Sequence, residues 1–131
     1  MSRNDLMSDS FTIIRNAARV RKEDAYIPYS KVIFEVCAIL KKEGYIENFK
    51  EVDLDNFKKI KVYLKYDGKK SVIIQLNRVS TPGRRSYLKR DEIKPVLNGY
   101  GLGIISTSLG MLTDKEAKEK GVGGEFIGQV W

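Results

Sequence analysis

Apolar residues near the start of the chain recur at the spacing of an amphipathic helix. The apolar stripe and its border comprise Phe11, Ile13, Ile14, Ala17, Ala18 and Val20. A period of three to four residues predicts a helix that rests one face on a core. Ser2 or Asn4 is suited to cap this helix, with Asp5 in its first turn.

A second helix is predicted over Lys31–Glu43. Ser30 is placed to cap its first turn, and Gly44 ends it. Strands are predicted on either side of this helix, over Ala25–Tyr29, Tyr45–Val52 and Ile60–Tyr66. The first half of the chain therefore reads helix, strand, helix, strand, strand.

The second half has shorter elements separated by turn residues. Asp67-Gly68 and Thr81-Pro82-Gly83 predict turns, and Glu116 is placed for a capping box with Thr113. The predicted elements are strands over Ser71–Val79, at Tyr87, from Ile104-Ile105 onward and over Glu125–Trp131, and short helices over Asp91–Leu97 and from Asp114 through Lys120.

The order of these elements predicts an α/β (α+β) fold of two small lobes. An N-terminal α/β lobe is expected over residues 1–68, and a mostly β lobe with one or two short helices over residues 69–131. A chain of 131 residues suits one compact unit or two small lobes that share a border.

Positive charge is in excess and is clustered. The chain has 24 Lys and Arg against 17 Asp and Glu, a net charge of +7. Two runs contain no acidic residue: Arg15, Arg19, Arg21 and Lys22, then Arg78, Arg84, Arg85, Lys89 and Arg90. Such runs favour a polyanion or an anionic membrane surface as partner.

The membrane interpretation has little further support in the sequence. No apolar stretch reaches the roughly 18 residues of a membrane helix, and the first residues lack the apolar core of a secretory signal. One cysteine excludes an intrachain disulfide, which fits a reducing compartment. We therefore expect a cytoplasmic protein with no membrane partner.

Common catalytic and metal-binding chemistry is missing. The chain has no histidine, which excludes Ser-His and Cys-His nucleophile pairs and imidazole metal sites. Cys37 falls on the apolar stripe of the second helix and is expected in the core. Asp53 and Asp55 read as a solvated turn, and the glycines from Gly99 to Gly103 do not follow a dinucleotide-binding pattern. No enzyme activity, cofactor or metal is predicted.

Two stretches carry chemistry suited to RNA. The first runs from Arg78 to Tyr87 and places a rigid turn among cations, with an aromatic ring close behind. Arginines contact phosphates, and an aromatic face stacks on an unpaired base. From the residues alone, a hairpin with a polar edge and a core tyrosine is equally well supported.

The second stretch places three consecutive hydroxyls at the end of a strand. Ser106, Thr107 and Ser108 are followed by Leu109 and by Gly110, which permits a sharp turn. Each hydroxyl both donates and accepts, and small side chains suit the shallow minor groove of RNA. By composition alone, an ordinary polar loop is the favoured interpretation.

These stretches and several others resemble the bacterial small-subunit ribosomal protein S8 family over nearly the whole chain. The order and spacing of the matching segments are specific, although each is weak by itself. They are Ile14-Arg15-Asn16, Tyr29-Ser30-Lys31, Leu40 to Ile46, Arg78-Val79-Ser80, Pro82-Gly83, Gly101-Leu102-Gly103, Ser106-Thr107-Ser108, Leu112 to Ala117, and Gly121 to Glu125.

The resemblance implies a structural protein of the cytoplasmic ribosome. A family member is expected to bind directly to an irregular helix in the central domain of small-subunit (16S-type) ribosomal RNA and to help assemble the platform. It is expected to adjoin other small-subunit ribosomal proteins. The resemblance also implies that the protein controls translation by binding its own operon messenger RNA.

The resemblance further implies which residues bind RNA. It places Ser106, Thr107 and Ser108, with Gly110 at the turn, in the minor groove, and Tyr87 against a base or sugar. The expected surface also includes Arg84, Arg85, Gly123, Gly124 and Glu125, with backbone contacts from Arg15, Asn16 and Lys31. One departure is Leu109, where the family usually has lysine, so one phosphate contact is absent.

Two other classes of function compete with this prediction. A general single-stranded nucleic-acid-binding module would need several exposed aromatic residues along a basic groove, and the sequence places only Tyr87 well for that role. An enzyme lacks a nucleophile–base pair.

Overall fold

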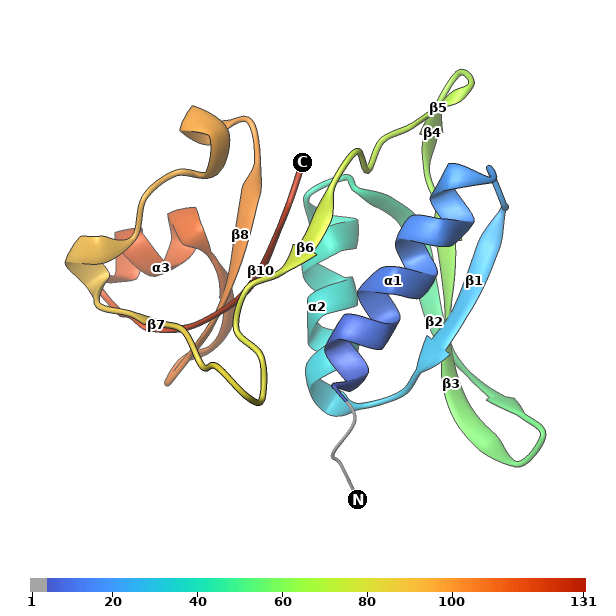
Figure 1. The fold of residues 1–131 in the computed structure, drawn as a ribbon, viewed down its shortest axis with the longest axis horizontal. Coiled ribbons are helices and arrows are strands. Elements are labelled where there is room, and N and C mark those ends of the chain that lie inside the picture. Colours follow the sequence, from blue (N-terminus) through green and yellow to red (C-terminus); the bar gives the residue numbers. More distant parts are fainter. Residues whose placement is uncertain (1–4) are drawn as a thin grey trace. The chain divides into compact units, whose positions relative to one another are not determined.

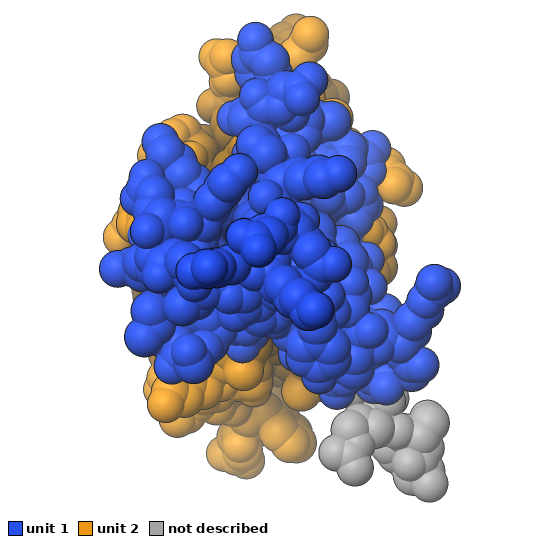
Figure 2. Space-filling view, turned by 90° about the vertical axis from the view of Figure 1, so that its left-hand side faces the viewer, with its two compact units in different colours: residues 1–5, 75–131 blue, residues 6–74 orange. Residues whose placement is uncertain are grey.

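The structure, a computed structural model, describes residues 5–131, which fold into two compact units. Leu6–Ile74 form one unit, and Gln75–Trp131 form the other together with Asp5. Figure 1 shows the ribbon, and Figure 2 distinguishes the two units by colour. No helix between residues 5 and 131 has an apolar run long enough to cross a membrane.

Two helices of the first unit follow the predicted apolar stripes. They are α1 (Leu6–Arg19) and α2 (Lys31–Lys42). The cap of α2 is confirmed, because the Ser30 hydroxyl accepts a hydrogen bond of 3.1 Å from the Ile33 amide. Cys37 is buried on α2, as expected.

The first helix departs from its predicted pattern at both ends. Ser2 and Asn4 lie outside the described residues, and Asp5 precedes the helix and pairs with Arg78. Phe11, Ile14, Ala17 and Ala18 are buried, but Val20 is 63% exposed. Val20, which the sequence puts beside the stripe, lies one residue past the end of the helix at Arg19.

An antiparallel sheet of three strands completes the core of this unit. The strands are β1 (Asp24–Pro28), β2 (Ile46–Leu54) and β3 (Phe57–Leu64), in the order β1-β3-β2. Alternate residues such as Ile27, Ile60 and Val62 are buried. Helix α1 packs on β1 and α2 on β2, so the helices cover one face of the sheet (Figure 1).

The segment after β3 is less regular than predicted. A tight hairpin joins β4 (Tyr66–Asp67) to β5 (Lys70–Ser71), with Gly68 at φ +65°, which confirms the turn. The single strand predicted over Ser71–Val79 was wrong, since β5 ends at Ser71 and the next strand is the short β6 (Leu76–Arg78). The Ile73 amide donates to the Ser71 hydroxyl instead of to a neighbouring strand.

Five strands form the sheet of the second unit. Their order is β6-β10-β8-β9, and β7 also pairs with β10, all antiparallel. The strands are β6, β7 (Tyr87–Leu88), β8 (Leu102–Thr107), β9 (Gly110–Thr113) and β10 (Gly124–Val130). Sequence reasoning did not predict β9.

Helix α3 (Asp114–Lys120) packs beside β8 and β9. Its predicted capping box is confirmed: Thr113 accepts from the Glu116 amide, and the Glu116 carboxylate accepts from the Thr113 amide. A small core forms beneath this helix from Ile93, Ile105, Leu112 and Ala117, with Leu88, Val122 and Phe126 packed against it.

The helix predicted over Asp91–Leu97 is absent. Two short 3₁₀ turns, η1 (Arg90–Glu92) and η2 (Val96–Gly99), stand in its place. Pro95 separates them, because proline lacks an amide donor and clashes with the preceding helical turn.

Candidate nucleic-acid interface

Strand pairing brings the predicted site residues of the second unit into two neighbouring rows. In one row, Glu125 of β10 lies between Tyr87 of β7 and Ser106 of β8. In the next row, Gly124 of β10 pairs with Thr107 of β8. Residues far apart in the sequence therefore meet at one end of the sheet.

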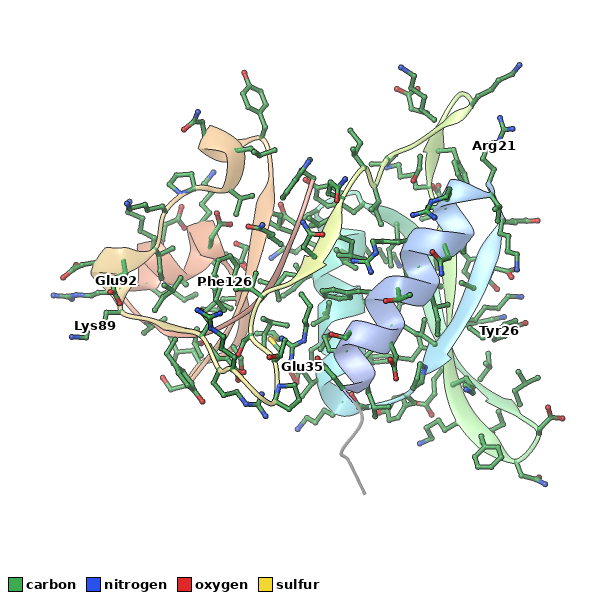
Figure 3. All side chains as sticks on the ribbon, viewed as in Figure 1. Arg21, Tyr26, Glu35, Lys89, Glu92 and Phe126 are labelled. Atoms are coloured by element: carbon green, nitrogen blue, oxygen red, sulfur yellow. The ribbon has the colours of Figure 1, made fainter. Side chains whose placement is uncertain are left out.

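Alternation along the strands separates the two faces of this sheet. Ile105 and Phe126 pair with each other and face the core, and Figure 3 shows Phe126 among the elements of this unit. Their neighbours Ser106 and Glu125 therefore point to the opposite face. Tyr87 shares that face and is 68% exposed, so the core-tyrosine interpretation of this residue was wrong.

The hydroxyl-bearing segment forms a tight turn between β8 and β9. The Thr107 hydroxyl donates to the Gly110 carbonyl at 2.8 Å and accepts from the Leu109 amide at 3.0 Å. Gly110 adopts φ +108°, which favours glycine. Thr107 thus holds the turn, while Ser108 and Leu109 are exposed at its tip.

Two glycines allow neighbouring backbones to approach this turn closely. A Cβ atom on Gly124 would lie 2.1 Å from the Ser106 carbonyl oxygen, and one on Gly123 would lie 2.2 Å from the Leu88 carbonyl oxygen. Neither position has room for a side chain. The glycines therefore shape the surface by letting β7, β8 and β10 come together.

A buried hydroxyl connects the basic loop to the sheet. Ser80 is fully buried; its hydroxyl donates to Glu125 Oε2 at 2.6 Å and accepts from the Ser86 amide at 3.0 Å. Arg85 donates to the same carboxylate oxygen at 2.9 Å. This network ties both ends of the Thr81-to-Arg85 turn to β10. Sequence reasoning missed this role of Ser80, although Ser80 belongs to the resembling segments.

The environment of Glu125 favours its charged form. Partial burial by itself raises the pKa of this carboxyl. The hydrogen bonds from Ser80 and Arg85, with the positive charges of Arg85 and Arg78, outweigh burial and hold the pKa of Glu125 below its ordinary value of 4.5. The carboxylate is therefore a fixed negative anchor for the basic loop.

The arginines of the second basic run have different surroundings. Arg78 is nearly buried; it pairs with Asp5 at 3.3 Å and donates to the Ile127 carbonyl at 2.8 Å. Arg84 is exposed, and within residues 5–131 no carboxylate lies at ion-pair distance from it. Arg85 is about half exposed beside Glu125. Arg78 is therefore a structural cation, whereas Arg84 and Arg85 are accessible to a partner.

The turn η1 also carries exposed charges beside β7. Lys89 lies just before η1 and Glu92 at its end, both labelled in Figure 3, and the Glu92 carboxylate accepts a hydrogen bond from the Lys89 amide. Arg90 makes a weak exposed pair with Asp91 at 3.7 Å.

The other three predicted site residues lie in the first unit. Arg15 is half-buried on α1 and donates to the Thr12 hydroxyl at 3.1 Å. Asn16 is exposed on the same helix, and Lys31 is exposed at the first position of α2. These residues belong to a different unit from the hydroxyl turn.

Outside this surface, Cys37 is a buried thiol on α2. Burial raises the pKa of the Cys37 thiol to about 12, which leaves it protonated and inert. Within the described part of the chain, no three acidic or cysteine side chains gather as metal ligands would.

Comparisons with known proteins cover both units. Residues 5–131 match the family model described as ribosomal protein S8. The small ribosomal subunit proteins uS8 of Syntrophus aciditrophicus and Levilactobacillus brevis are 50% and 49% identical to this chain, with 100% of each chain covered. The protein of the same name from Campylobacter jejuni is 49% identical over 98% of each chain.

The Gly124→Ala substitution should lower the free energy of unfolding by about 1–3 kcal/mol, because its methyl group meets the Ser106 backbone. Urea denaturation measures the change. Gly83→Ala is the matched control, since a Cβ there meets no atom within 4 Å. Equal stabilities of the two variants would contradict this account of Gly124.

The ion pair of Glu125 should stabilise the fold at neutral pH and lose that effect in acid. Because the pKa of Glu125 is lower in the folded chain, its contribution is fully present above 4.5 and disappears as pH falls through the folded-state pKa. Glu125→Gln should therefore be less stable than wild type by about 1 kcal/mol at pH 7. Urea titrations over a pH series test this, and a difference that stays constant into acid would refute it.

Proposed function

The chain belongs to the ribosomal protein S8 family, and from this membership we propose that it binds small-subunit ribosomal RNA directly through the surface around the Thr107–Gly110 turn. The family consists of structural ribosomal proteins and not of enzymes. The protein is a structural constituent of the small subunit of cytoplasmic ribosomes.

The exposed hydroxyl turn is the observation that carries the proposal. Ser108 lies at the tip. Ser106 lies two positions earlier, on the face of β8 opposite the core. The minor groove of an RNA helix is wide and shallow and displays 2′-hydroxyls and base edges. A narrow turn with short polar side chains reaches those groups. In this scheme Ser106 and Ser108 contact RNA, and Thr107 acts by holding the turn.

Tyr87 is proposed as the aromatic contact. Its ring is exposed and lies in the same cross-strand row as Glu125 and Ser106. An exposed ring packs on a sugar or on a base that leaves the helix. Glu125 contributes by ordering the basic loop rather than by touching RNA phosphate, which its charge would repel.

The phosphate contacts are proposed to come from Arg84 and Arg85. Arg84 has no carboxylate partner among the described residues, so its guanidinium is available to an anion. Arg85 gives one donor to Glu125 and keeps others for phosphate. Leu109 is exposed at the tip of the turn but carries no charge. The attraction to phosphate at this surface is therefore proposed to come from Arg84 and Arg85.

The remaining contacts are proposed from the resemblance to the family. Arg15, Asn16 and Lys31 would touch RNA backbone from the first unit. The target is an irregular helix in the central domain, where binding helps to assemble the platform beside neighbouring ribosomal proteins. A segment of the operon messenger RNA with the same shape would bind the same surface. Translation of that messenger RNA would then depend on the concentration of free protein.

Ser108→Ala should weaken binding to the central-domain helix by about two- to tenfold, the effect of one lost hydrogen bond. Binding to an unrelated RNA duplex should be nearly unchanged, because the hydroxyl reads local shape. Filter binding with both RNAs measures the two affinities. Equal losses on both would exclude direct readout by Ser108 and favour a general nucleic-acid-binding module.

Arg84→Gln should weaken binding to both RNAs and reduce the slope of log affinity against log salt by about 0.9, the effect of one lost phosphate contact on a duplex. The control is Arg78→Lys, which keeps a charge at a nearly buried position paired with Asp5 and should not change the slope. An Arg84→Gln slope equal to that of wild type would place Arg84 away from phosphate.

A further inference from the structure

The sheet of the first unit has an open face that the helices do not cover. Side chains on this face alternate with the buried residues Ile27, Ile60 and Val62. Figure 3 shows Tyr26 projecting from β1 on the side away from α1. The open face is therefore available to a partner without any rearrangement of the core.

Aromatic rings and lysines interleave across the open face. In the central row, Lys61 of β3 lies between Tyr26 of β1 and Lys50 of β2. Tyr63 lies two positions further along β3, opposite Asp24. A third row places Lys59 between Pro28 and Val52. We call Tyr26, Lys50, Lys59, Lys61 and Tyr63 the tyrosine–lysine face.

The cations of this face lie close to its rings. The Lys61 ammonium is 5.8 Å from the centre of the Tyr26 ring and 5.0 Å from that of Tyr63. The Lys50 ammonium is 5.9 Å from the Tyr63 ring centre. These are cation–π distances. A hydrogen bond from Lys50 is the main cause that holds the pKa of the Tyr63 phenol below its ordinary value, with a further contribution from Lys61.

The charge of the face is positive. Asp24 is the acidic residue in these rows, and it lies 3.7 Å from Lys61. Lys50 remains as a positive charge beside the Tyr63 ring, and Lys59 as another in the row next to Tyr26. Lys50 is exposed, Tyr26 is 40% exposed, and Tyr63 and Lys59 are half-buried. The face therefore offers both a stacking surface and unneutralised cations.

We propose that the tyrosine–lysine face binds an unpaired segment of RNA. Bases stack on Tyr26 and Tyr63, Lys50 contacts the phosphate between them, and Lys59, one row beyond Tyr26, contacts the next phosphate. Diagonal neighbours on adjacent strands are about 7–8 Å apart, so the two rings can serve neighbouring nucleotides. This contact is separate from the hydroxyl turn, which reads a helical groove. An acidic protein segment would use the cations but would leave the two rings, exposed Tyr26 and half-buried Tyr63, without a role.

Fluorescence anisotropy with a labelled oligouridylate tests the proposal in the full-length chain. Tyr26→Ser should weaken binding about fivefold or more, the effect of losing one stacked base. Tyr26→Phe, which keeps the ring, should weaken it less than Tyr26→Ser. The control is Tyr100→Ser, because Tyr100 is 85% exposed but belongs to the other unit. Equal oligouridylate affinities of wild type and Tyr26→Ser would overturn the proposal.

A second variant does not depend on the stability of β1. Lys50 is exposed, and Lys50→Gln should reduce the salt slope for oligouridylate by about 0.7. Lys69→Gln, in the exposed turn between β4 and β5, is the matched control and should leave the slope unchanged. The same reduction in both variants would mean general charge attraction and would overturn the proposal.

Photocrosslinking with 4-thiouridine in the oligomer locates the contact. The expected crosslinks fall in β1 and β3, and crosslinks confined to Gln75–Trp131 would overturn the proposal. Competition by polyglutamate identifies the alternative partner. If polyglutamate displaces the oligomer and the tyrosine variants bind both probes as wild type does, the face is an acidic-protein surface instead.

Discussion

The close approach of Gly124 to the backbone at Ser106 is the constraint on which the second unit depends. Strand β10 pairs with β6, β7 and β8, and Gly124 is the position where β7 and β8 meet on either side of it. Because no side chain separates the backbones there, the exposed ring of Tyr87 and the hydroxyl turn share one end of the sheet. A side chain at this position would part the strands that build the proposed RNA surface.

Electrostatics then orders the loop beside that surface. Glu125 follows Gly124 and points to the face of the second unit's sheet opposite the core. There it accepts hydrogen bonds from the buried Ser80 hydroxyl and from Arg85. A negative charge inside a basic surface that is proposed to bind RNA would repel the RNA, but here it holds an arginine and a turn in place. Fewer loop conformations would then be lost on RNA binding, which would favour affinity.

The two units offer different chemistry to RNA. The second presents short hydroxyl side chains on a narrow turn, which suit a groove. The first presents rings and lysines on one face of a sheet, which would suit unpaired bases. The sequence-based argument against single-strand binding rested on a single well-placed aromatic residue, Tyr87. It did not consider Tyr26 and Tyr63, since these residues are 37 positions apart in the chain and become neighbours through β1–β3 pairing.

Features that depend on a few adjacent residues could be predicted from the sequence. The Ser30 cap, the Thr113–Glu116 capping box, the turns at Gly68 and Pro82-Gly83, and the exposed hydroxyl turn all follow from local side-chain and backbone preferences. The tertiary structure alone decided which charges are free and which residues are neighbours. Arg78 and Arg84 look alike in the sequence, yet one pairs with Asp5 and the other faces solvent. The reason is physical: an ion pair, a buried hydroxyl such as Ser80 and a cross-strand row each require partners distant in the chain, and only strand register brings those partners within reach.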